Sequence, residues 1–113
     1  MDRVYFVELV PLKIHTGWLV SYNNFYYSDA LETHFNERLL IIVNEYFRRI
    51  IDLGWYPKSN PSGEYCIIVA VMSEGVHGLG YWNGPLAYFK SKDIHSIIEK
   101  LNEYMAQINA GNL

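Results

Sequence analysis

The chain has 113 residues, of which 50% are hydrophobic, 16% aromatic and 19% charged, and its formal net charge is −3. This length suits one domain, residues 1–113, and the aromatic and aliphatic content excludes extensive disorder. A chain of this size buries about two-thirds of its unfolded surface, so it needs neither a metal nor a disulfide to fold.

The sequence favours a cytoplasmic protein. The N-terminal stretch MDRVYFVELVPLK has neither a basic leader nor a small-residue cleavage site, so we expect no secretory signal. The longest apolar runs, 39–43 and 66–72, are far shorter than the roughly 20 residues that cross a bilayer, so we expect no membrane partner. The single cysteine, Cys66, lies inside an apolar run, which predicts an inert buried thiol.

The first quarter of the chain is expected to form strands. A β-branched and aromatic run at 4–10 stops before Pro11, and 17–22 is predicted to be its hairpin partner. An asparagine turn then leads to a short strand at 25–27.

A long helix is predicted next, at residues 30–53. Asp29 followed by Glu32 has the form of a capping box, and Gly54 supplies a left-handed stop. Apolar residues recur at helical spacing, and their neighbours widen the stripe to about half of the circumference. The stripe consists of Leu31, Phe35, Leu39, Ile42, Tyr46 and Ile50.

The second half of the chain is expected to hold two strands and a second helix. The segment 55–64, WYPKSNPSGE, indicates a surface loop, whereas 65–73 is apolar at both parities, as in a strand buried on both faces. A short strand at 86–90 and a helix capped by Ser91 follow, and Gly111 ends that helix.

These elements predict an α+β fold of order ββαββα, with two helices on a mixed sheet of four to five strands. The strand at 65–73 and much of the first strand are apolar on both faces, which leaves two alternatives open. Either one helix covers each face of the sheet, or a partner outside the chain, such as a second copy, covers one face.

No pattern in the sequence is specific for a metal, a nucleotide or another cofactor, and we expect none. The four histidines are far apart and no second cysteine joins them. The run with Gly75, Gly78 and Gly80 follows a strand but leads into another strand, whereas a phosphate loop leads into a helix. The acidic balance, with almost no basic residues among the aromatic ones, argues against nucleic-acid binding.

An enzymatic alternative rests on Glu74, His77 and Tyr81. A carboxylate, an imidazole and a phenol at this spacing suit general acid and base chemistry. The same three side chains also fit an ordinary polar surface loop, so no catalytic residue is assigned.

Two stretches, 14–28 and 53–89, combine many aromatic residues with few charges. The first has no Asp, Glu, Lys or Arg, and the second has only Lys58, Glu64 and Glu74. Protein interfaces have this composition because Tyr and Trp bury a large area with few rotatable bonds. The alternative is that the rings pack back over the sheet as small cores. The predicted binding residues are Trp55, Tyr56, Glu64, Glu74, His77, Tyr81 and Trp82.

The chain is predicted to be a small acidic α+β domain with aromatic loops. Its most suggestive local stretch is GYWNGPLAYFKSKDI at 80–94, a strand that runs into a capped helix. In this overall organisation the chain resembles the immunity proteins of contact-dependent growth inhibition and related bacterial competition systems. The resemblance implies a stoichiometric inhibitor that occludes a toxin domain, often a basic nuclease, and it transfers no functional residue. In that role Glu64 and Glu74 would face a cationic partner. The alternatives are a homodimeric ligand-binding or regulatory domain and the small enzyme described above.

Overall fold

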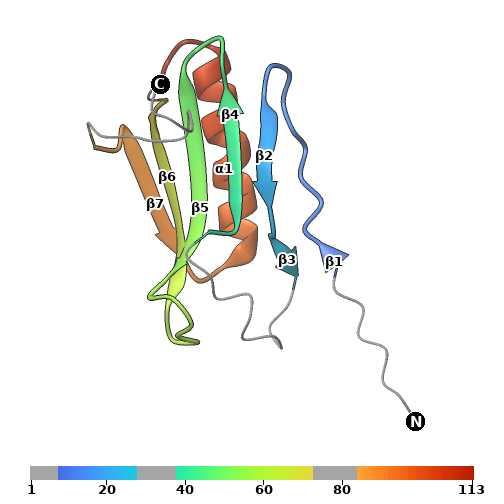
Figure 1. The fold of residues 1–113 in the computed structure, drawn as a ribbon, viewed down its shortest axis with the longest axis vertical. Helices are drawn as coiled ribbons and strands as arrows, with labels where there is room; N and C mark the ends of the chain where they lie inside the picture. The colour runs from blue at the N-terminus through green and yellow to red at the C-terminus, as the bar shows by residue number, and fades with distance from the viewer. Residues whose placement is uncertain (1–7, 28–37, 73–83) are drawn as a thin grey trace.

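The computed structural model describes residues 8–27, 38–72 and 84–113. These residues form seven strands followed by one helix (Figure 1). The elements are β1 (Glu8–Leu9), β2 (Leu19–Asn23), β3 (Tyr26–Tyr27), β4 (Leu40–Asn44), β5 (Arg49–Tyr56), β6 (Glu64–Val71), β7 (Ala87–Ser91) and α1 (Ile94–Asn109).

Five of the strands form one antiparallel sheet with the order β2-β4-β5-β6-β7. The short strands β1 and β3 pair separately, with Leu9 opposite Tyr26. Figure 1 shows α1 running along one face of the large sheet. None of the helical structure within the described ranges has the length and apolar content to cross a bilayer.

The main core lies between α1 and the sheet. Side chains at alternate positions of a strand point to the same face, so every second residue of β4, β5 and β6 faces the helix. Each such side chain contributes about 1.5–3 kcal/mol when it is fully buried. The sheet supplies Leu40, Ile42, Ile51, Leu53, Trp55, Ile67 and Val69, and the helix supplies Ile97, Leu101, Tyr104, Met105 and Ile108.

A smaller core lies on the sheet face opposite α1, where Ile41, Val43, Ile50 and Ala70 pack together. β6 therefore has buried side chains on both faces, as the apolar run at 65–73 predicted. This part of the prediction is confirmed.

The predicted helix at 30–53 is wrong. Its described part is the hairpin β4–β5, in which Ile42 pairs with Ile51. The Asn44 side chain accepts a hydrogen bond from the Phe47 N–H at 3.0 Å, and Arg48 adopts a positive φ of 59°, so the chain reverses direction here. The β-branched residues of both strands favour this extended pairing.

The overall plan therefore differs from the predicted order ββαββα with two helices. The described chain has seven strands in two sheets and one C-terminal helix, and the sheets are antiparallel instead of mixed. Asp29 and Glu32, the proposed capping box, lie outside the described residues, and Gly54 lies within β5.

The two ends of the chain carry smaller differences. β1, the described part of the strand predicted at 4–10, pairs with β3 and not with 17–22. The C-terminal helix is confirmed, but its N-cap is Asp93 in place of Ser91. Gly111 follows the helix with a φ of +78°, a conformation that glycine adopts without strain.

One polar cluster joins the N-terminal segment, β4 and α1. The Asn109 Oδ1 atom accepts hydrogen bonds from Asn44 Nδ2 at 3.2 Å and from Trp18 Nε1 at 3.1 Å. Its Nδ2 donates to the Thr16 carbonyl at 3.1 Å. Asn44 is 1% exposed, and each of its bonds replaces one that it would make to water. The cluster thus fixes the end of α1 against the sheet.

Candidate functional site

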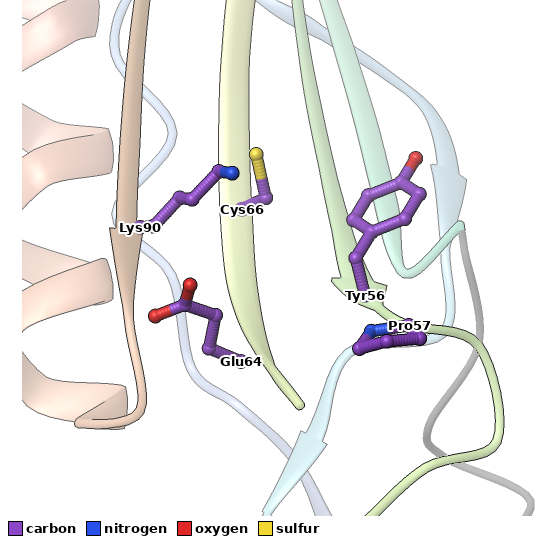
Figure 2. Close-up of a pocket in the computed structure, with 5 residues that line it drawn as sticks. All are labelled: Tyr56, Pro57, Glu64, Cys66 and Lys90. Atoms are coloured by element: carbon purple, nitrogen blue, oxygen red, sulfur yellow. The ribbon is translucent and has the colours of Figure 1, made fainter. Parts of the chain in front are cut away.

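A pocket opens on the sheet face opposite α1, over β5, β6 and β7 (Figure 2). It consists of two overlapping hollows of about 300 and 420 Å³, a size that suits a small ligand. The lining residues are Tyr56, Pro57, Glu64, Cys66, Ile68, Pro85, Tyr88 and Lys90.

The strand register explains why this part of the sheet is hollow. Cys66 lies between Gly54 on β5 and Lys90 on β7, so one row of the sheet holds a position with no side chain and a short thiol. The larger rings of Tyr56 and Tyr88 belong to the rows on either side. The small row becomes the floor of the pocket, and the rings become its walls.

One carboxylate and one ammonium group flank this floor. Glu64 on β6 is diagonal to Lys90 on β7, because Lys90 pairs with Cys66, two residues further along β6. Within the described part of the chain, neither charge has an ion-pair partner within 4.0 Å. The Lys90 Nζ atom lies 6.0 Å from the centre of the Tyr88 ring, and Figure 2 shows it directed toward the Cys66 sulfur.

Cys66 is buried, as its apolar surroundings predicted. Burial is the main cause that raises the pKa of its thiol, while Lys90 opposes this shift and Asp52 and Glu64 add to it. The group therefore remains a neutral thiol near neutral pH and is a weak nucleophile. This arrangement does not support covalent catalysis at Cys66.

A second exposed surface lies at the other side of the sheet, on β2. All five residues of this strand are exposed, and Leu19 is 55%, Val20 48% and Tyr22 41% exposed. In the described ranges β2 pairs with β4 along one side and with no strand along the other. Val20 pairs with Ile42 and so lies on the face of the sheet that α1 covers, whereas Leu19 and Tyr22 pair with Val43 and Ile41 on the opposite face. We call these exposed residues on both faces of the edge strand, Leu19, Val20 and Tyr22, the β2 surface.

Among the predicted binding residues, the structure brings Tyr56 and Glu64 together. They are paired across β5 and β6, and both line the pocket. Trp55, by contrast, is 7% exposed, meets the Tyr65 ring edge to face at 4.9 Å, and donates its Nε1 proton to the Asn60 carbonyl at 2.7 Å. Its indole belongs to the main core, so Trp55 is no exposed anchor.

The other predicted binding residues, Glu74, His77, Tyr81 and Trp82, lie outside the described residues. The enzymatic alternative depends on Glu74, His77 and Tyr81, so the described residues do not test it. Among the residues that are described, no three His, Cys, Asp or Glu side chains gather as metal ligands.

Sequence reasoning missed Tyr88 and Lys90. A signal was present in the sequence, since the two occupy alternate positions of the short strand predicted at 86–90 and therefore share one face of it. The prediction that rings in the uncharged stretches face outward is only partly right. Tyr22 does, but Trp18 and Phe25 are buried in the main core.

No protein-family model, no curated protein and no solved structure matches this chain.

Proposed function

We propose that the chain is a protein-binding module, and that it acts as an immunity protein which inhibits a cognate toxin domain by stoichiometric occlusion. The observation that carries this proposal is the β2 surface, where Leu19, Val20 and Tyr22 expose apolar area on an uncharged edge strand. A partner that covers them removes this area from water.

The two edges of the large sheet support assigning the docking surface to β2. Proteins protect exposed sheet edges with lysine, because unpaired backbone groups otherwise attract another chain. β7 follows this rule, with Lys90 in the strand and Lys92 just after it. β2 has no charged residue, which favours addition of a strand from a partner polypeptide.

The charge of the chain supports a basic partner. The formal net charge of −3 attracts a cationic domain and speeds its approach, while the β2 surface supplies the buried contact. A cytoplasmic location is part of the same proposal, and a single buried free thiol is compatible with that reducing compartment.

The test is binding to the toxin domain encoded beside this gene, measured by titration calorimetry with both purified proteins. We expect a 1:1 complex with a dissociation constant at or below about 1 µM. Val20→Lys should weaken it at least about tenfold, because a charge would be buried in the contact. The matched control is Val71→Lys, which places the same charge at a similarly exposed position, 41%, three strands away.

Two results would contradict the proposal. One is wild-type affinity of the Val20→Lys variant for the toxin domain. The other is the absence of a toxin gene beside this gene, together with a Val20→Lys variant that still binds every protein that the wild type binds. Circular dichroism of both variants shows whether the fold is retained.

A second copy of this chain is the alternative partner for the same edge. An uncharged edge strand that pairs with itself would form a symmetric dimer. Sedimentation velocity distinguishes the two. A dimer that Val20→Lys abolishes would support the homodimeric alternative, and a monomer at high micromolar concentration would remove it.

A further inference from the structure

The pocket has properties that a docking edge does not need. It lies over β5, β6 and β7, which β4 separates from β2, it has the volume of a small-ligand site, and its walls are two tyrosine rings, Tyr56 and Tyr88. It also carries two opposite charges, Glu64 and Lys90, which do not neutralise each other through an ion pair.

We propose that this pocket binds a free zwitterionic α-amino acid with an aromatic or large apolar side chain. The Lys90 ammonium group binds the carboxylate of the ligand, and the Glu64 carboxylate binds its α-ammonium group. The rings of Tyr56 and Tyr88 pack against its side chain. This inference goes beyond the proposed protein-binding function and does not depend on it.

The positions of the two charges suit the ends of one amino-acid backbone. Glu64 and Lys90 occupy diagonal positions on neighbouring strands, where side chains start about 7–8 Å apart. Both side chains are long enough to adjust that separation, and hydrogen bonds between ionised groups are short, about 2.7–2.9 Å. A ligand that carries both charges a few bonds apart therefore fits between them.

Other classes of ligand leave part of this pocket unsatisfied. A simple anion would be attracted by Lys90 but repelled by the carboxylate of Glu64, and the carboxylate of Asp52 lies on the same face of the sheet. A simple cation would be repelled by the ammonium group of Lys90. An uncharged apolar ligand would displace water from both charged groups and offer them no hydrogen bonds in return, which costs binding free energy. A zwitterion with an apolar side chain satisfies each group.

The pocket floor is compatible with this role. Cys66 is a neutral thiol, so it does not compete with a ligand carboxylate for the Lys90 ammonium group. Lys90 lies over the Tyr88 ring at 6.0 Å, which keeps its charge near the pocket. Ile68 and Pro85 complete the apolar wall.

The test uses L-phenylalanine as the probe, with titration calorimetry of the full chain. Two analogues separate the charges, because N-acetyl-L-phenylalanine lacks the ammonium group and L-phenylalaninamide lacks the carboxylate. We expect saturable 1:1 binding of L-phenylalanine, and each analogue at least about tenfold weaker. The analogues also mimic peptide ends, so their weak binding would identify a free amino acid as the ligand.

Two variants assign the charges. Glu64→Gln should lose the preference for L-phenylalanine over the N-acetyl analogue, and Lys90→Gln should lose the preference over the amide. The controls, Glu99→Gln and Lys92→Gln, make the same changes at exposed positions outside the pocket and should keep both preferences.

Several results would overturn the proposal. They are equal affinity for the three ligands, unchanged preferences in both pocket variants, or no saturable binding of either L-phenylalanine or L-leucine at millimolar concentration. The Val20→Lys variant should bind L-phenylalanine like the wild type. Failure of the docking proposal and failure of this one are thus distinguishable.

Discussion

Cys66 shows how burial controls the chemistry of a single side chain in the pocket. Burial raises the pKa of this thiol above its usual value, so the thiolate forms only at higher pH than in the unfolded chain. The shift therefore contributes to the free energy of unfolding in full at pH values below the pKa that the thiol has in the unfolded chain. That contribution is lost as the pH rises from there through the pKa of the folded state.

We expect iodoacetamide to modify Cys66 slowly at neutral pH, because the reagent requires an accessible thiolate. The rate should rise with pH around a midpoint above the usual cysteine value. The same measurement on the protein in denaturant gives the reference midpoint. A folded-state midpoint at or below that reference would contradict the assigned effect of burial.

Gly63 is a second position where one atom decides the outcome. A Cβ atom there would lie 2.5 Å from the Tyr56 carbonyl oxygen and 2.8 Å from Trp55 Nε1. We expect Gly63→Ala to lower the free energy of unfolding by about 1–3 kcal/mol, because the loop must shift away from β5. Urea denaturation measures the change. The neighbouring exposed control, Ser62→Ala, should stay within about 0.5 kcal/mol.

At the scale of elements, the β4–β5 hairpin explains the main error of the sequence analysis. Nearly every residue at 39–43 and 50–55 is apolar, and such a run fits a helical stripe and a strand buried on both faces equally well. What decides is the turn between them, where the Asn44 side chain binds the Phe47 N–H. A dense β-branched run, 41–43, that ends at an asparagine was the local signal for a hairpin.

The C-terminal helix was predictable because its signals are local. Its apolar spacing, a polar N-terminal cap and Gly111 all lie within one short segment. The pocket was not predictable in the same way. Cys66 comes to lie between Gly54 and Lys90 only through strand pairing between distant parts of the chain. A shift of one residue in the register of β6 would point Cys66 to the helix side, and the same shift in β7 would do so for Lys90, and no local pattern fixes that register.

The Asn109 cluster ties three elements together and gives a test at this scale. Asn109→Ala should lower the free energy of unfolding by about 2–4 kcal/mol, because it leaves the buried Asn44 amide and the Trp18 indole N–H without their acceptor. Thermal and urea unfolding measure the loss. Asn112→Ala, at an exposed position just beyond the helix, is the control. An equal effect of the two variants would show that the cluster contributes little.

At the scale of the whole molecule, the two faces and the two edges of the large sheet are unequal. α1 covers one face, and the opposite face holds the small core and the pocket. One edge, β2, is uncharged and exposed, whereas the other edge, β7, carries lysine. This division separates a surface suited to a polypeptide from a pocket suited to a small ligand within one sheet.

The lysines at β7 should keep that edge from pairing with other molecules. In the described chain β7 pairs only with β6, so its outer backbone groups have no strand partner. The double variant Lys90→Val with Lys92→Val removes the protecting charges and leaves a β-branched edge. We expect it to associate as its concentration rises, measured by sedimentation velocity, with its circular dichroism unchanged. The control, Lys13→Val with Lys58→Val, changes the net charge equally at exposed positions outside β7. Because both doubles have the same net charge, equal association would attribute the effect to charge alone and contradict the protection of this edge.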